Sequence, residues 1–522
     1  MRSSPHPAVV FVVIFVAIFL LHAPLLQLPY FWDEAGYYVP AARDLLLTGS
    51  LIPHTTISNA HPPLVMAWVA LWWKAAGYAP VVTRSAMLVI AAFSLMGVFR
   101  LAARVANPQV AAAATLCTAL YPVFFAQSSL AQVDLAAAGL TFWALSAYME
   151  DRPVSLAIWF SLAVLAKETA ILTPIALACW QVLGNAVPNR SRIAVLWNDS
   201  RANGSRIFGL LFPLLPLTAW YAYHYSRTGY VFGNPEFFRY NVASTLNPLR
   251  FLIAFVLRLW QAFGYMHLWI LTAAMLLGMQ LKPVSDAEGE RPRISIPTQA
   301  IFLVIVFAYV VAMALIGGAV LARYMLPAVP LVIILAVSTL RRRLRYWMAS
   351  VAIISVVLVS ALFWNPPYGF SPEDNLAYAD YIRLHQGAES FIETHDPHAR
   401  VLTAWPASDE LSRPYLGYVK NAMKVVRIED FTAEQLMAAS DARSSFDWAL
   451  VFSTKYQPPR SIFDRWRVWQ QWKTRFFGYH VDLSSTAAAS ILGGELVYKD
   501  ERQGQWVGVI RLQRIEEAQL HP

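Results

Sequence analysis

Long apolar runs dominate the first two thirds of the chain, and short polar or basic connections separate them. Clear examples are Ala8–Leu28, Val81–Leu101, Ile207–Tyr225 and Phe251–Met279. Runs of this length approach or exceed the roughly 20 residues that an α-helix needs to cross the hydrocarbon core of a bilayer. The pattern predicts a polytopic α-helical membrane protein with about 11–13 transmembrane helices. The other full spans that we expect are Gln109–Phe125, Ser129–Met149, Thr298–Ile316, Tyr324–Leu340 and Tyr346–Trp364.

Two apolar stretches depart from this pattern because they are short. Val154–Leu165 and Ala170–Leu183 predict a hairpin that is too short for two full crossings, with Lys167 and Glu168 at its tip. Short helices of this kind leave a cavity that polar residues can line. Pro62–Ala76 is also short and rich in tryptophan, which prefers the headgroup zone. It predicts an interfacial or re-entrant helix.

The composition changes abruptly after Asn365-Pro366-Pro367. Strand-like runs follow at Arg400–Trp405, Trp448–Ser453 and Trp506–Leu512, with a helical pattern at Asn375–Gln386. Such a mixture is typical of a soluble α/β or α+β domain. We therefore predict a transmembrane domain over residues 1–365, with a first outer loop at 30–80, and a soluble extracytoplasmic domain over residues 366–522.

Composition and charge fix the compartment and the orientation that we expect. Hydrophobic residues make up 57% of the 522-residue chain and charged residues only 14%, and the net charge is +9. An average soluble domain carries roughly 25% charged residues. The positive-inside rule assigns the basic connections to the cytoplasm. We expect a multi-pass protein of the inner (plasma) membrane with a cytoplasmic N-terminus and a periplasmic C-terminal domain, and no nucleic-acid partner. The basic connections include Arg100, Arg104, Arg190, Arg192, Arg201, Arg206, Lys282, Arg291, Arg293, Arg341, Arg342, Arg343 and Arg345.

An adjacent pair of carboxylates, Asp33 and Glu34, follows the first apolar run. A carboxylate pair at a membrane boundary is unfavourable unless it is solvated or used, so it marks a candidate functional site. Asp33 can also act as the N-cap of a helix over Glu34–Leu47, favoured by the helix dipole. A carboxylate in an outer cavity can act as a general base toward a hydroxyl. The two interpretations are compatible.

Cationic and polar residues at the expected outer ends of other spans complete the candidate site. Lys167 suits the binding of an anion such as phosphate, although an ion pair with Glu168 or snorkelling would also account for it. Arg323 opens a span on the same side and can clamp a phosphate or anchor its helix. His61 precedes two prolines and suits either a site or a stiff helix entry. Asp134 can orient a cation or a sugar hydroxyl, or serve helix packing.

Taken together, these motifs resemble the GT-C class of polyprenyl-phosphate-dependent glycosyltransferases, especially the lipid A aminoarabinose transferases and the protein O-mannosyltransferases (families 39 and 83). The resemblance covers roughly residues 8–345. Two motifs differ from those of the aminoarabinose transferases: His61 replaces a lysine before the paired prolines, and Lys167-Glu168-Thr169 stands where that family has Lys-Gly-Pro. The residues that carry the resemblance are Asp33-Glu34 with Tyr37, Ala42-Arg43-Asp44-Leu45, His61-Pro62-Pro63-Leu64, Asp134, Ala166-Lys167-Glu168 before Pro174, and Arg323-Tyr324-Met325-Leu326-Pro327.

The resemblance implies a hexosyl or pentosyl transferase that moves a sugar, with inversion, from a polyprenyl-phosphate donor to an acceptor hydroxyl on the outer face of the membrane. Its partners would be that donor, membrane lipids, and a lipid, glycan or protein acceptor. Asp33 and Glu34 would be catalytic. Lys167, Arg323 and His61 would bind the donor phosphate, and Tyr37, Asp134 and Tyr324 the substrates.

Other classes and cofactors are less well supported by the sequence. A transporter or flippase, or a non-catalytic glycolipid-binding protein, is the alternative function. A transporter would be expected to contain inverted repeats, and none is visible. We assign no metal ligands, because His395-Asp396-Pro397-His398 lacks further ligands at a defined spacing. A divalent cation is the one cofactor left open.

Overall fold

The computed structural model describes residues 6–186, 204–242, 245–287, 289–456, 458 and 465–512. The chain divides into two compact units. The helical unit comprises Met1–Leu26 and Ala41–Trp364, and the α/β unit comprises Gln27–Pro40 and Asn365–Pro522. The α/β unit thus includes a segment from near the N-terminus that carries the Asp33-Glu34 pair. The basic residues Arg190, Arg192 and Arg201 lie outside the described residues.

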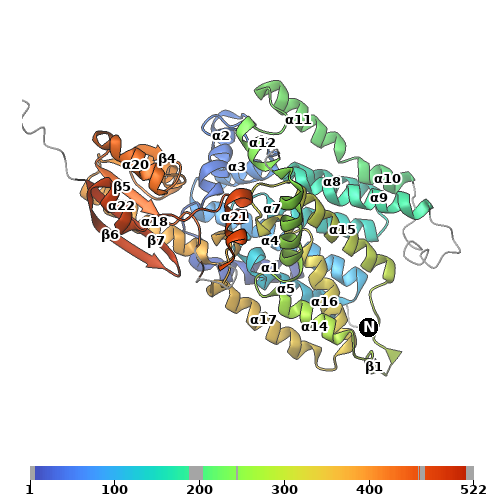
Figure 1. Cartoon of the computed structure of the whole chain (residues 1–522). Helices are drawn as coiled ribbons and strands as arrows, with labels where there is room; N and C mark the ends of the chain where they lie inside the picture. Colours follow the sequence, from blue (N-terminus) through green and yellow to red (C-terminus); the bar gives the residue numbers. More distant parts are fainter. Residues whose placement is uncertain are drawn as a thin grey trace, which may run out of the picture. The chain divides into compact units, whose positions relative to one another are not determined.

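The helical unit is built from helices and one small two-stranded ribbon (Figure 1). Its helices are α1 (Pro7–His22), α2 (Val39–Thr48, which begins two residues before the unit), α3 (Leu64–Ala76), α4 (Pro80–Val105), α5 (Pro108–Leu120), α6 (Pro122–Gln127), α7 (Asp134–Met149), α8 (Pro153–Ala166), α9 (Leu172–Ala186), α10 (Gly204–Leu211), α11 (Leu214–Thr228), α12 (Pro235–Asn241), α13 (Pro248–Phe263), α14 (Leu268–Gly278), α15 (Ile296–Leu315), α16 (Val329–Arg343) and α17 (Trp347–Phe363), and its strands are β1 (Ser285–Asp286) and β2 (Gly289–Glu290).

The predicted helical membrane class is confirmed, although few helices reach full spanning length. Among the described residues, four helices are long and apolar enough to cross a membrane, or five if α13 and α14 count as one broken span. Five shorter apolar helices accompany them, including α3 and the α8–α9 hairpin that the sequence predicts to be short. The total of about 11–13 crossings therefore stays a prediction, based on the roughly 20-residue requirement.

The predicted continuous spans Phe251–Met279 and Gln109–Phe125 are broken in the structure. Phe251–Met279 forms α13 and α14, which meet at an angle of 76°. Met266 and His267 adopt positive φ values of 47° and 65° at the break, a conformation that an α-helix cannot continue through. Gln109–Phe125 forms α5 and α6, which are divided at Tyr121 before Pro122. Proline disfavours the α-conformation of the residue before it, so the helix ends there.

The core of the helical unit centres on α7, whose residues are almost all buried. It packs against α4 and α8, and α4 also packs against α5 and α1. The α4–α7 approach depends on Gly139, because a Cβ atom there would lie 1.9 Å from the Ser94 Oγ atom. A substitution at Gly139 would therefore separate the two helices and move Asp134, which lies in the first turn of α7.

The α/β unit contains a five-stranded mixed sheet in the order β4-β3-β5-β7-β6. The β3 strand pairs in parallel with β4 and β5, whereas β7 pairs antiparallel with β5 and β6. Helix α18 packs against β6 and β7, and α19 packs against β3 and β4. The elements are β3 (Arg400–Ala404), β4 (Lys424–Ile428), β5 (Trp448–Phe452), β6 (Gly494–Arg502), β7 (Gln505–Leu512), α18 (Ala377–His395), α19 (Ala407–Ser412), α20 (Ala433–Asp441), α21 (Arg467–Phe477) and α22 (Ser485–Leu492).

The sheet confirms the predicted mixture of strands and helices, and three of its strands lie where the sequence places them. These are β3, β5 and β7, which are largely buried and therefore strongly apolar. The sequence analysis missed β4 and β6. Both are mostly half-exposed and carry charged residues, so their hydrophobic pattern is weak.

Candidate functional site

Three predicted site residues meet in the interior of the helical unit. The Lys167 Nζ atom lies 2.5 Å from Asp134 Oδ1, and the Arg323 Nε atom lies 3.3 Å from Asp134 Oδ2. The side chains of all three are at most 7% exposed. Arg323 also donates to the amide oxygen of Gln132 at 2.5 Å. The cluster holds two cations for one carboxylate, so it retains a net positive charge.

Local chain geometry brings these residues to the ends of their elements. Asp134 opens α7, where the helix dipole favours a carboxylate. Lys167 has an extended backbone at the point where α8 ends and before a 3₁₀ turn, Glu168–Ile171, leads into α9. Arg323 lies in another 3₁₀ turn, Ala322–Met325, before α16. Side chains at such breaks project from the ends of the helices instead of their sides. The sequence left an ion pair with Glu168 open for Lys167. The structure instead pairs Lys167 with Asp134.

An aromatic ring and a further arginine extend the cluster. The Lys167 Nζ atom lies 4.0 Å from the ring centre of Tyr324, and the guanidinium carbons of Arg323 and Arg258 lie 5.6 and 5.5 Å from the same centre. Arg258 is fully buried in α13 and donates to the backbone oxygens of Met313 and Leu321. The sequence analysis missed Arg258. An arginine inside an apolar span is itself the signal that would have identified it.

His61 lies beside Glu168, the residue after Lys167. Its Nδ1 atom is 3.1 Å from Glu168 Oε2, and the two side chains are 11% and 23% exposed. His61 and Glu168 belong to the two motifs in which the chain differs from the aminoarabinose transferases. The structure joins one residue from each of these motifs in an interacting pair.

The Asp33-Glu34 pair belongs to the α/β unit, where its two carboxylates have different surroundings. Glu34 is fully buried, and its Oε2 atom accepts a hydrogen bond from the Phe31 N–H at 2.9 Å. Asp33 is partly exposed and stands at the N-cap of a π-helical turn, Glu34–Tyr38. Asp33 thus occupies the predicted N-cap position, but its side chain makes no capping hydrogen bond. Tyr37 is buried in the same turn.

Aromatic residues of the α/β unit hold this acidic segment. The Phe31 ring meets Tyr381 edge-on at 5.2 Å, and the Trp32 ring packs against Tyr381 at 5.7 Å and Trp405 at 5.1 Å. Gly36 lies so close to Trp405 that a Cβ atom would come within 2.7 Å of the indole ring. These aromatic contacts, with residues of α18 and of the loop before α19, hold the segment that carries Asp33 in place.

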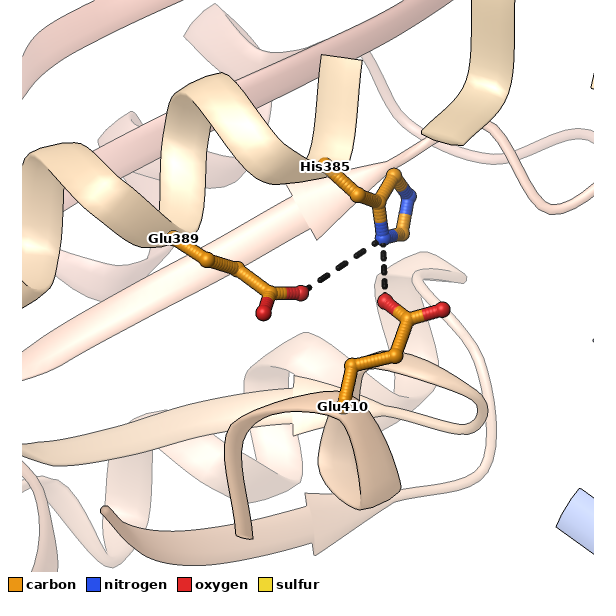
Figure 2. A group of neighbouring side chains, drawn as sticks. All are labelled: His385, Glu389 and Glu410. Carbon is orange, nitrogen blue, oxygen red and sulfur yellow. Dashed lines mark hydrogen bonds and ion pairs between the residues drawn. The ribbon is translucent and has the colours of Figure 1, made fainter. Parts of the chain in front are cut away.

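One group of described residues in the α/β unit could hold a metal ion. It consists of His385 and Glu389 from α18 and Glu410 from α19, whose ligand atoms all lie within 4.8 Å of one another (Figure 2). The His395–His398 turn, which the sequence analysis rejected, is not part of the group. The sequence analysis had no local signal for Glu410, which lies 21 residues after Glu389.

Comparison with solved structures gives matches over nearly the whole chain. ArnT from Cupriavidus metallidurans in the apo state matches with a TM-score of 0.54 and 15% sequence identity, covering 97% of this chain and 98% of ArnT. ArnT from the same organism bound to undecaprenyl phosphate gives a TM-score of 0.51 and 13% identity, with 96% and 97% covered. This chain has the ArnT fold. ArnT is a lipid A aminoarabinose transferase of the GT-C class, so the resemblance expected from the motifs is confirmed at the level of the fold.

The Archaeoglobus fulgidus oligosaccharyltransferase in complex with Zn and sulfate also matches, with a TM-score of 0.45, 14% identity, and 85% of this chain and 68% of that chain covered. Neither the protein-family models nor the curated protein sequences gave a match.

Proposed function

We propose that this protein is an integral membrane glycosyltransferase that moves a hexose or pentose from a polyprenyl-phosphate donor to an acceptor hydroxyl on a lipid, glycan or protein. The observation that carries the proposal is the buried Asp134–Lys167–Arg323 cluster, with its surplus positive charge, in a chain with the ArnT fold. A related structure of that fold was solved with undecaprenyl phosphate bound.

In the proposed reaction the acceptor hydroxyl oxygen attacks the anomeric carbon of the sugar, and the bond from that carbon to the phosphate oxygen breaks. Asp33 accepts the hydroxyl proton, and the polyprenyl phosphate leaves with the bonding electron pair. Attack from the face opposite the leaving group inverts the anomeric centre. Negative charge grows on the phosphate in the transition state, which is where fixed cations stabilise most effectively.

The remaining site residues have supporting roles in the proposal. Lys167 and Arg323 bind the phosphate, and Asp134 orients both cations. Tyr324 and Tyr37 bind substrate. His61, held by Glu168, contributes to the phosphate site. Glu34 positions Asp33, because its carboxylate closes the turn on the Phe31 N–H. No step of the proposed reaction is assigned to a divalent cation.

The proposal also places the reaction at the outer face of the inner membrane, with a cytoplasmic N-terminus and a periplasmic α/β unit. Support comes from the arginine-rich end of α16, Arg341–Arg343, which the positive-inside rule assigns to the cytoplasm. A cysteine-accessibility scan with a membrane-impermeant reagent would test this orientation.

Asp33→Asn is the decisive variant. Purified protein in proteoliposomes would be supplied with polyprenyl-phosphate hexoses and pentoses and a panel of acceptors. We expect turnover to fall by roughly 10²–10⁴-fold in Asp33→Asn, the range typical of a lost general base. Asp441→Asn, at the exposed end of α20, is the matched control and should keep full activity. Full activity in Asp33→Asn would remove the proposed base, and donor binding without turnover in the parent protein would favour a flippase or glycolipid-binding protein.

A further inference from the structure

Three titratable side chains are buried together in the α/β unit. His385 and Glu389 lie four residues apart on α18, so they share one face of that helix, and Glu410 reaches them from α19 (Figure 2). Each of the three residues is at most 1% exposed. The group therefore has to satisfy its charges without help from water.

The contacts inside the group leave several polar atoms unsatisfied. His385 Nδ1 lies 2.6 Å from Glu410 Oε2 and 3.8 Å from Glu389 Oε1. Neither oxygen of Glu389 has a hydrogen-bond partner among the described residues, and Glu410 Oε1 has none either. The Glu389 carboxylate is nevertheless directed at the other two side chains (Figure 2).

The surroundings add no compensating cation. The His385 ring stacks on Tyr381 at 3.9 Å and meets the edge of Phe452 at 4.5 Å. Within the part of the chain that the structure describes, no lysine or arginine forms an ion pair with Glu389 or Glu410. Two carboxylates and one imidazole thus carry net negative charge in an apolar shell, which is strongly unfavourable unless something neutralises it.

A proton or a divalent cation can supply the missing positive charge. Burial, and next the charge of Glu410, raise the pKa of Glu389 well above its ordinary value, because the ionised pair is unfavourable without a compensating charge. A divalent cation does more, because two carboxylates, a neutral imidazole and one M²⁺ sum to zero charge. It would also use the oxygens that have no partner.

We propose that His385, Glu389 and Glu410 bind a divalent cation, with Zn²⁺ the best match, which ties α18 to α19. Imidazole nitrogen and carboxylate oxygen are both ordinary Zn²⁺ ligands at about 2.0–2.2 Å, so tetrahedral ligand atoms lie roughly 3.3–3.6 Å apart. His385 Nδ1 lies 2.6 and 3.8 Å from the two carboxylates, and all three ligand atoms lie within 4.8 Å of one another, so side-chain rotations are needed to bring them to that spacing. A second oxygen of Glu389 or Glu410 can complete the coordination.

The cation would act as a structural clamp for the acidic segment. Helix α18 supplies Tyr381, which packs against Phe31 and Trp32, and the loop before α19 supplies Trp405, which packs against Trp32. Joining α18 to α19 therefore fixes both sides of the aromatic cradle that holds the chain next to Asp33. The inference concerns metal binding and stands independently of the proposed glycosyl transfer.

The test uses the purified full-length protein in detergent. The protein is stripped with a chelator, reconstituted with ZnCl₂, passed through a desalting column and analysed for zinc by mass spectrometry. We expect one zinc per chain and slower hydrogen exchange at residues 30–38 in the zinc-loaded form. Co²⁺ in place of Zn²⁺ should give the intense visible bands of a four-coordinate site.

Glu389→Gln is the informative variant, because its amide can still donate a hydrogen bond to Glu410 and preserve the metal-free packing. We expect its zinc affinity to fall by more than about 100-fold. His395→Ala removes an exposed histidine from the end of the same helix and should bind zinc like the parent. If the parent keeps no stoichiometric zinc after reconstitution, or if Glu389→Gln keeps it equally well, the proposal is overturned and the group is a proton-sharing pair.

Discussion

The two units each bury carboxylates, but they neutralise them in opposite ways. In the helical unit, Asp134 lies between Lys167 and Arg323, so cations exceed anions. In the α/β unit, His385 is the one possible cation that pairs with Glu389 and Glu410 among the described residues, so anions exceed cations. The surplus charge indicates the missing partner in each case. A surplus of buried cations suits an anionic ligand such as phosphate, and a surplus of buried carboxylates suits a proton or a metal ion.

The largest effect that we expect comes from removing the shared anion of the helical cluster. Asp134→Asn leaves Lys167 and Arg323 buried without their counter-ion, which should lower the free energy of unfolding by about 3–5 kcal/mol. Thermal unfolding in detergent would measure the change. The control is Asp151→Asn, because that carboxylate is 57% exposed where it pairs with Arg206 and should matter little. Equal effects of the two variants would contradict the idea that Asp134 is the structural centre of the cluster.

The cluster of His385, Glu389 and Glu410 should instead make the stability of the protein depend on pH. The raised pKa of Glu389 means that the folded, metal-free protein binds a proton that the unfolded chain releases above about pH 4.5. Stability should therefore fall as pH rises toward the folded-state pKa, by up to about 1.4 kcal/mol per pH unit. Unfolding in the presence of a chelator at several pH values would measure the slope.

Glu389→Gln should flatten that slope, because the amide does not titrate. Glu434→Gln, exposed on α20, provides the comparison and should leave the slope unchanged. A slope that persists in Glu389→Gln would assign the effect to another group and weaken the contrast between the two clusters.

Lys167→Met tests whether the cationic surplus serves a ligand. Removing one of the two proposed phosphate-binding cations should raise the KM for the polyprenyl-phosphate donor by on the order of 10–100-fold. This factor corresponds to the free energy lost with one charge-assisted hydrogen bond. Asp134 keeps Arg323 as a partner, so the fold should persist. Lys74→Met, at the exposed end of α3, is the control. Unchanged donor dependence in Lys167→Met would show that the cluster is purely structural.

The smallest effect that we expect on stability comes from Asp482, a carboxylate of the α/β unit that lies beside His480. Burial opposes ionisation of Asp482, but its ion pair with His480 (Nε2 to Oδ1, 3.4 Å) and two hydrogen bonds donated by Thr454 outweigh burial and lower the pKa of Asp482. The interaction with Asp482 in turn raises the pKa of His480. Asp482→Asn should cost about 1 kcal/mol at about pH 5–6. The loss should shrink as pH falls through the lowered aspartate pKa and as it rises through the raised histidine pKa. An NMR titration of His480 would check the shift.

Local pattern was sufficient for much of the fold. The short α8–α9 hairpin, the interfacial-length α3 and the strands β3, β5 and β7 lie where apolar runs and their lengths place them. The breaks at Tyr121 and at Met266–His267 were not predicted, because hydrophobicity continues across both. Hydrophobicity reports burial or contact with lipid, and it does not report backbone direction.

The candidate site shows more clearly which features the local sequence pattern reveals and which depend on the tertiary structure. The sequence singled out Asp33, Lys167, Arg323 and Asp134 as charged residues at the ends of apolar runs, and a charge is conspicuous there for local reasons. It could not tell that Asp134 pairs with Lys167, or that His61 pairs with Glu168, because these partners lie 33 and 107 residues apart. Only the packing of the helices against one another decides which charges meet. The sequence alone therefore determined which residues are costly to bury, and the tertiary structure decided how each charge is neutralised, since electrostatic pairing acts over ångströms in space whatever the separation along the chain.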